Sequence, residues 1–301
     1  MALDRDDFGL FLQSINRCYG PECANRLPQT TDFPADIFGA DDKLRIDSLI
    51  DFASTQSDKY LLSVINRIIA VANIQQSRDR GGNLDIKSAW RLITHSILTI
   101  PSESTISSIG SQGFLSIPLY IDDRVKAELE FIRIHIWDNS LSEYIDKEKC
   151  RNFSIHCHSF FARSWVVFGK VINDRYLVTK CKGPAEQSLF TIGFNGSPSN
   201  INRHVSSATN AGIDVFVEQI SHEIYMSGAT YRIEAGDFHK SGTAHEGGLS
   251  ATIFSFTAKD GFLETSYVIG PRQVMTSEIN RRMHIDPIKL LNKLDAAIHE
   301  S

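Results

Sequence analysis

The stretch Ile155-His156-Cys157-His158 is the most informative part of this sequence for the fold and for a metal site. It opens a strand-like apolar run over residues 159–171, with Gly169 near its end. Side chains two residues apart on a strand point to the same face, so His156 and His158 are expected to be neighbours. Two imidazoles on one face are the start of a metal site.

A third histidine stands far downstream, at the end of Glu234-Ala235-Gly236-Asp237-Phe238-His239. If that segment lies beside the first, three imidazoles would hold a metal from one side and leave the other side open for chemistry. The alternative for His156 and His158 is a strand pair whose rings are satisfied by hydrogen bonds. The downstream Gly-x-x-His spacing favours the metal site, with His156, His158 and His239 as ligands.

The composition is that of an ordinary soluble globular protein. Of 301 residues 42% are hydrophobic and 22% charged, a length that suits one large domain or a core with a smaller companion. The formal net charge of −5 gives no basic signature for nucleic acid. The chain has no apolar run of membrane-spanning length and no signal-peptide hydrophobic region at its start, so we expect a cytoplasmic protein without membrane or nucleic-acid partners. Five scattered cysteines argue against a disulfide framework.

The first hundred residues have helical periodicity. Apolar residues recur at helix spacing in three segments: Phe8, Phe11, Leu12 and Ile15; Leu61, Leu62, Ile65, Ile68, Ile69 and Ala72; and Trp90, Ile93, Ile97 and Leu98. Ser57 and Asp58 are expected to cap the second helix, and Arg80-Gly81-Gly82 to end it.

From Gly113 the pattern becomes that of strands. Residues 131–137 alternate, with Ile132, Ile134 and Ile136 on one face and Phe131, Arg133, His135 and Trp137 on the other. Further strands are predicted over residues 160–171, 175–179, 188–192, 214–220, 223–226, 230–234, 250–257 and 265–269. Residues 195–210 are predicted to be a surface loop. Many short strands with turn residues between them indicate an all-β sandwich or barrel.

The chain therefore divides into three predicted parts. Residues 1–105 form a helical region, residues 110–272 a β-domain, and residues 273–301 a C-terminal helix. Pro287 stands near the start of that helix, and apolar residues from Ile288 to Ile298 give it one apolar face.

The histidine motifs resemble those of the cupin superfamily over roughly residues 113–270. The first cupin motif is His-x-His followed by a glutamate and then a glycine; here His156 and His158 are followed by Arg163 and Gly169. Arg163 stands where the glutamate ligand is expected, and Cys150 stands in place of the motif's leading glycine.

The second cupin motif has a glycine, Pro-x-Gly and a histidine. Here Gly228 is followed by Glu234-Ala235-Gly236 and His239, so Glu234 replaces the proline. The long separation between Gly169 and Gly228 implies an insertion. The resemblance implies a cupin-type antiparallel β-barrel or jelly roll, mainly β, with a helical N-terminal region that makes the protein α+β as a whole.

Loss of the glutamate makes the site similar to that of three-histidine cupins such as the thiol dioxygenases, which bind ferrous iron. By this resemblance His156, His158 and His239 would hold Fe(II), with Mn, Ni and Zn as alternatives. Arg163 would pair with a substrate carboxylate. Strand parity, however, puts Arg163 on the face opposite the histidines, so a site role needs a bulge.

Other candidates stand near this motif. Tyr231 and Tyr267 are on strands expected to line the barrel, where a phenol would position O2 or a substrate proton; packing in the core is the alternative for each. His135 is a candidate neighbour of the site or a fourth ligand, with a strand-edge position as the alternative. His245 is an alternative ligand or acid–base group in an expected turn. Cys157 is expected to face away from the ligands.

The resemblance implies a non-haem Fe(II) oxygenase, and the known uses of the cupin fold imply a setting in small-molecule or natural-product metabolism. Its partners would be O2 and a small metabolite that chelates the metal through a thiol, amine or carboxylate, and cupins also suggest a homodimer. One alternative is a cupin isomerase, lyase or decarboxylase in which the metal acts as a Lewis acid. Another is a non-enzymatic cupin that binds a ligand.

Overall fold

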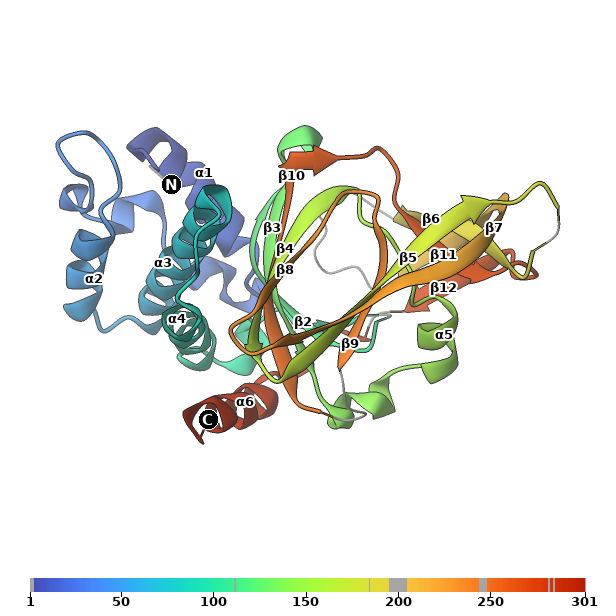
Figure 1. The fold of residues 1–301 in the computed structure, drawn as a ribbon. Coiled ribbons are helices and arrows are strands. Elements are labelled where there is room, and N and C mark those ends of the chain that lie inside the picture. Colours follow the sequence, from blue (N-terminus) through green and yellow to red (C-terminus); the bar gives the residue numbers. More distant parts are fainter. Residues whose placement is uncertain are drawn as a thin grey trace.

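The computed structural model describes residues 3–110, 112–183, 185–194, 205–243, 248–280, 282–283 and 285–300. A layer of helices covers one side of a large antiparallel sheet, and a second antiparallel sheet extends away from it (Figure 1). The helices are α1 (Arg5–Asn16), α2 (Ile46–Ser54), α3 (Lys59–Arg80), α4 (Ile86–Leu98), α5 (Lys147–Asn152) and α6 (Ile288–Glu300). The predicted change from helices to strands is confirmed.

Helix α3 begins and ends where the sequence indicates. The Asp58 carboxylate accepts hydrogen bonds from the backbone N–H groups of Tyr60 and Leu61, which satisfies donors that the first turn leaves open. Gly81 ends the helix in the left-handed conformation, with φ of 64°.

The first sheet has seven strands in the order β13-β1-β2-β3-β10-β4-β8, all antiparallel. Their bounds are β1 (Ser108–Ile109), β2 (Leu115–Asp122), β3 (Glu130–Trp137), β4 (Phe160–Phe168), β8 (Thr230–Ile233), β10 (Ser250–Phe262) and β13 (Arg282–Met283).

The second sheet has six strands. Its main order is β11-β6-β7-β5-β9, and β12 pairs with β7. The bounds are β5 (Lys170–Lys180), β6 (Gln187–Phe194), β7 (Val205–Met226), β9 (Phe238–Thr243), β11 (Tyr267–Pro271) and β12 (Thr276–Asn280). Within the described residues neither order of the named strands returns to its first strand, so the ladders between these strands by themselves close no barrel. The antiparallel, β-rich architecture is confirmed; the cupin jelly roll stays a prediction.

Glycines of the histidine motifs mark the places where the chain changes sheet. Gly169 joins β4 of the first sheet to β5 of the second, and Gly236 lies in the turn from β8 back to β9. Both have a positive φ, 78° and 88°. A Cβ on Gly169 would lie 2.4 Å from the carbonyl oxygen of Leu249, so the corner there requires glycine.

This corner changes two of the predicted strands. The run predicted over residues 160–171 breaks at Gly169, and Asn173-Asp174, which lie between the strands predicted over 160–171 and 175–179, are inside β5. The predicted strands at 214–220 and 223–226 are one strand, β7, whose pairing with β5 shifts register between Arg175 and Tyr176. One continuous strand with a bulge therefore stands where two separate strands were predicted, over residues 214–220 and 223–226. Of the predicted loop over 195–210, residues 195–204 lie outside the described part, and 205–210 belong to β7.

The seven-stranded sheet buries both faces. Ile132, Ile134 and Ile136 belong to the core that also contains the apolar faces of α1, α3, α4 and α6. Trp137 lies on the opposite face, in a core shared with Tyr225 of the second sheet. The alternation predicted for residues 131–137 is confirmed, and we call the face that carries Trp137 the inner face. One core joins the helices and the sheet. The division of the chain into three parts, at residues 1–105, 110–272 and 273–301, stays a prediction.

The segment predicted as a C-terminal helix, residues 273–301, is helical only in its last part. Helix α6 begins at Ile288, and the strands β12 and β13 precede it. Within the part of the chain that the structure describes, no helix combines the length and the apolar character needed to cross a membrane.

The first prediction concerns a buried ion pair between helix α3 and strand β3. Arg78 pairs with Glu130, with only 3% and 8% of the two side chains exposed. Arg78→Met should lower the free energy of unfolding by about 3–5 kcal/mol, because it leaves the Glu130 carboxylate buried without its counter-charge. Denaturant unfolding measures the change. The control Lys126→Met breaks an exposed pair with Glu264 and should cost less than about 1 kcal/mol; equal losses would contradict the prediction.

Candidate metal centre

The His-x-His segment is held between two strands of the second sheet. The backbone N–H of His156 donates to the carbonyl of His239 at 3.0 Å, and that of His239 donates back at 2.9 Å. His156 also forms a bridge to Val268 of β11. Strand β4 begins only at Phe160, so the prediction that the histidines open this strand is wrong. Their segment pairs with β9 and β11 instead, because it crosses from one sheet to the other.

This pairing brings the three predicted ligands together. The ring centroids of His156 and His239 are 4.4 Å apart, and each lies 4.8 Å from that of His158. One ligand atom from each residue lies within 4.8 Å of the other two. Three imidazole nitrogens at this separation can converge on one ion.

Backbone carbonyls orient two of the rings. Nδ1 of His156 lies 3.0 Å from the carbonyl oxygen of Ser154, and Nδ1 of His239 lies 3.1 Å from that of Asp237. A carbonyl oxygen only accepts hydrogen bonds, so each Nδ1 carries the proton and Nε2 is left with a free lone pair. This is the arrangement that a metal-ligating histidine needs.

The environment keeps the three imidazoles neutral, as metal ligation requires. Burial lowers the pKa of His156, and burial together with the neighbouring histidines lowers the pKa of His158 and His239 well below the ordinary value. His239 is 1% exposed, whereas His156 and His158 are partly exposed. The donor set therefore fits a divalent cation with one accessible side.

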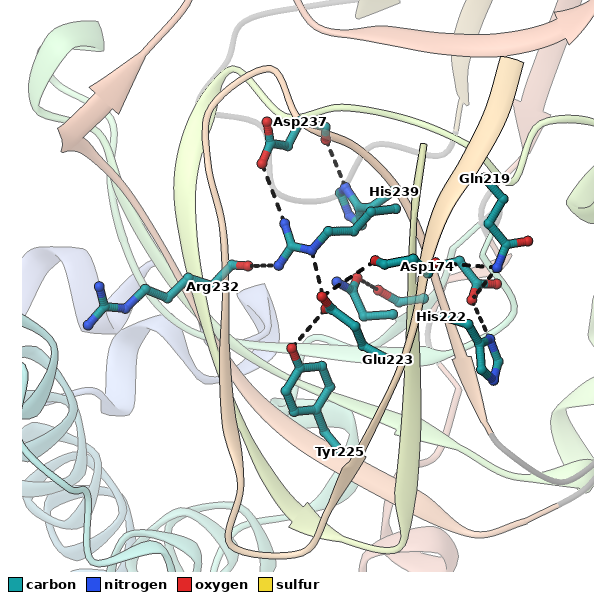
Figure 2. A network of polar contacts seen from close by, with 12 residues as sticks. Asp174, Gln219, His222, Glu223, Tyr225, Arg232, Asp237 and His239 are labelled. Carbon is teal, nitrogen blue, oxygen red and sulfur yellow. Dashed lines mark hydrogen bonds and ion pairs between the residues drawn. The ribbon is translucent and has the colours of Figure 1, made fainter. Parts of the chain in front are cut away.

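Arg175 of β5 connects the surroundings of His239. Its guanidinium lies 3.2 Å from Glu223 and 3.4 Å from Asp237, and it donates to the carbonyl of Arg232 at 2.5 Å. Figure 2 shows Glu223, Asp237 and His239 around this network. Because the Asp237 carbonyl orients the His239 ring, Arg175 fixes the turn on which that orientation depends.

Arg163 does not face the histidines. Its guanidinium donates to the carbonyls of Ser77, Arg78 and Gly82 at the end of α3, each at 3.4 Å. It pairs in regular register with Ser255, so the bulge that a site role requires is missing at this position. The proposed pairing of Arg163 with substrate is therefore corrected: its charge stabilises the C-terminal end of helix α3.

The two predicted tyrosines have different surroundings. Tyr231 is on the inner face, buried, with its ring stacked on Tyr225 at 4.6 Å. Burial raises the pKa of its hydroxyl. Tyr267 packs against the same buried cluster as Ile155 and Phe238, the sequence neighbours of His156 and His239, and so its side chain lies on the side away from the imidazoles. The structure thus leaves Tyr231 near the space between the sheets and removes Tyr267 from it.

Three other sequence candidates are also placed. His135 is buried on the inner face, with Nε2 unpartnered among the described residues. Cys157 is buried as expected, and its sulfur accepts a hydrogen bond from the backbone N–H of Tyr267 at 3.2 Å. His245 lies outside the described residues.

Arg133 is the functional candidate that the sequence reasoning passed over. It lies on the inner face, with its guanidinium 4.7 Å from the centroid of Phe131 and 4.9 Å from that of Phe256. The Phe256 ring lies 4.8 Å from that of His158, so Arg133 and His158 contact the same ring. After burial, the positive charge of Arg133 is among the causes that lower the pKa of His156 and His158. The alternation of residues 131–137 already predicts that Arg133 and His135 share a face. The sequence pattern does not show that this face is directed toward His156, His158 and His239.

Two cavities of about 240 and 210 Å³ lie elsewhere in the molecule. The first is lined by Phe8, Phe33 and Phe38 in the helical layer, and the second by Trp90, Val167 and Ile298. Neither contains one of the histidines. The candidate site therefore rests on the arrangement of the imidazoles.

The second prediction concerns Arg175. Arg175→Met should weaken divalent-metal binding about 10–100-fold, because the Asp237 turn loses its anchor and the His239 ring its fixed orientation. Competition between the protein and a chelator for Co(II) or Zn(II) measures the affinity. Asp174→Asn is the matched control: Asp174 contacts His222 and Gln219 in the neighbouring part of the network. An equal loss of affinity in both variants would contradict the role of Arg175.

The third prediction concerns pH. Because the pKa of His158 is lowered in the folded chain, the unfolded chain takes up a proton near its ordinary value of 6.5 while the folded chain does not. The free energy of unfolding of metal-free protein should therefore fall as the pH drops below about 6.5. Denaturant unfolding between pH 7.5 and 5.5 measures the slope. His158→Phe should make it shallower, and an unchanged slope would refute the assignment.

Comparisons with known proteins give no family. No family model matches the sequence, and no curated protein matches it. Among solved structures, the crystal structure of FeII HppE is 11% identical over 70% of this chain and 97% of that chain, with a TM-score of 0.28. The hydroxypropylphosphonic acid epoxidase from S. wedmorenis is 10% identical over 70% and 96%, with a TM-score of 0.27. At TM-scores below 0.5, neither similarity carries a conclusion about fold or function.

Proposed function

We propose that this protein is a metal-dependent enzyme of the cupin type, a non-haem Fe(II) oxygenase with a three-histidine site. The observation that carries the proposal is the convergence of His156, His158 and His239, whose ligand atoms lie within 4.8 Å of one another. Iron(II) held by these residues would supply open coordination positions for substrate and O2 and the electrons that pass between them.

The chain's own residues define the ligand geometry. The carbonyls of Ser154 and Asp237 hold the protons of His156 and His239 on Nδ1, so that Nε2 of each ring would be free to offer its lone pair to the ion. Arg175 holds the Asp237 turn in place. Partial exposure of His156 and His158 leaves the side from which substrate and O2 would approach.

The electrostatics favour an anionic substrate. Three neutral imidazoles do not offset the charge of a divalent ion, and Arg133 adds a further positive charge beside them. A small metabolite that chelates the metal through a thiolate, carboxylate or amine fits these charges. In this proposal Arg133 has the charge-pairing role that the sequence suggested for Arg163, and Tyr231 is the candidate tyrosine on the inner face.

The setting proposed for this chemistry is cytoplasmic small-molecule or natural-product metabolism, with a homodimer as the assembly. These proposals rest on the cupin resemblance of the two histidine motifs. The helical layer contributes Ser77, Arg78 and Gly82 to the support of Arg163 behind the inner face. Its part in the function is thus to stabilise the sheet that carries Arg133.

The fourth prediction tests the metal and its chemistry. Purified protein should contain stoichiometric iron or another divalent metal, and His156→Ala and His239→Ala should lose it while folding normally. His222→Ala is the control, because His222 pairs with Asp174 on the other face of β7. Elemental analysis by mass spectrometry measures the content, and an unchanged content in both ligand variants would remove the three-histidine site.

Oxygen consumption then separates oxygenase from Lewis-acid chemistry. Iron-loaded protein should consume O2 in the presence of a turned-over thiol or carboxylate substrate, and His239→Ala should not. Full turnover of that substrate without O2 would eliminate the oxygenase and favour the cupin isomerases, lyases and decarboxylases instead.

A further inference from the structure

Among the buried polar atoms on the inner face of the seven-stranded sheet that have no hydrogen-bond partner among the described residues, three belong to neighbouring positions on β3 and β10. They are Nε2 of His135, Nε1 of Trp137 and Oγ1 of Thr252, none of which has a hydrogen-bond partner among the described residues. Their side chains are 4%, 7% and 0% exposed. Buried polar groups are almost always hydrogen-bonded, so three unpartnered ones together indicate a place for an absent acceptor.

The strand register makes these atoms neighbours. Thr252 of β10 pairs directly with His135 of β3, and Trp137 follows His135 by two residues on the same face. The His135 ring lies 5.9 Å from the Trp137 ring. We call His135, Trp137 and Thr252 the inner donor group.

The inner donor group lies one aromatic ring away from the metal ligands. The ring of Phe254 is 5.0 Å from that of His135 and 6.3 Å from that of His158. A molecule that chelates a metal at the three histidines would thus extend past Phe254 to the inner donor group.

The chemistry of the group selects what it binds. The indole N–H of Trp137 only donates, the hydroxyl of Thr252 donates or accepts, and the neutral imidazole of His135 has one donor nitrogen. Arg133, two residues before His135 on the same face, adds a positive charge. Donors with a positive charge beside them match an oxygen that accepts hydrogen bonds.

We infer that the substrate carries, beyond its metal-chelating end, a second oxygen-bearing group that accepts hydrogen bonds from His135, Trp137 and Thr252. The oxygen belongs to a carboxylate or to a hydroxyl, and its negative charge or lone pairs are what the group recognises. This inference rests on the proposed function, because it uses the three-histidine centre as the anchor of the chelating end.

Hydroxamates of matched length test the inference in Co(II)-loaded protein. Acetohydroxamate has only the chelating end, butyrohydroxamate ends in a methyl group, and 4-hydroxybutyrohydroxamate and succinic acid monohydroxamate end in a hydroxyl and a carboxylate. The visible spectrum of Co(II) reports binding. We expect an oxygen-terminated ligand to bind about tenfold more tightly than butyrohydroxamate, the size of a hydrogen bond gained in a buried site. The better of the two distinguishes carboxylate from hydroxyl.

Variants assign the preference to the inner donor group. Thr252→Val and His135→Phe should bring the ratio close to one and leave the affinity for acetohydroxamate unchanged. Thr257→Val is the matched control, because Thr257 is buried on the same strand but on the opposite face. Equal binding of methyl-terminated and oxygen-terminated ligands to the natural protein, or a preference that survives both variants, would overturn the inference.

Two further measurements distinguish a failure of the proposed function from a failure of this inference. If the protein binds neither Co(II) nor acetohydroxamate, the proposed function fails and the inference falls with it. Thermal unfolding of metal-free protein gives an independent check: Thr252→Val should keep or raise the melting temperature, because it removes a hydroxyl without a partner. A lower melting temperature would show that the hydroxyl is already satisfied within the protein, and this too would overturn the inference.

Discussion

Two backbone hydrogen bonds between His156 and His239 carry the candidate centre. They join residues 83 positions apart in the sequence, and each is donated by one ligand residue to the other. Because paired residues of an antiparallel bridge turn their side chains to the same face, this bridge alone makes the two imidazoles neighbours. His158 follows two residues later on the same segment and completes the group. Without the bridge, His239 would be separate from the pair His156 and His158.

The bridge depends in turn on how the chain changes sheets. The corner at Gly169 sends the chain into β5, and the turn with Gly236 returns it to β9, beside the His-x-His segment. Arg175 of β5 pairs in register with His239 and holds the turn through Asp237. Gly169 and Gly236 bend the backbone, and Arg175 holds the turn. Together they position His239.

Charge on the two faces of the first sheet is kept apart. On the helical side, the buried charges are offset within the protein: Arg78 pairs with Glu130, and Arg163 faces carbonyls at the end of α3. On the inner side, Arg133 lies over the rings of Phe131 and Phe256 and close to three neutral imidazoles. In the proposed function, a positive charge beside uncharged imidazoles suits an anionic molecule, whereas Arg78 and Arg163 stabilise the contact between the sheet and the helices. Arg133 on β3 and Arg163 on β4 therefore lie on opposite faces of the same sheet.

Much of this could be predicted from the amino-acid pattern because the interactions are local. Helix caps at Asp58 and Gly81, the alternation of residues 131–137 and the motif spacing of the histidines each depend on neighbours within a few residues. Parity also placed Arg163 opposite the histidines, against the role that the resemblance suggested. What no local pattern contains is which strand lies beside which. The pairing of His156 with β9 and β11, the direction in which Arg133 faces and the continuity of β5 through Asn173-Asp174 depend on contacts between distant segments. Such contacts exist only once the two sheets have assembled, so they were decided by packing and not by the order of residues along the chain.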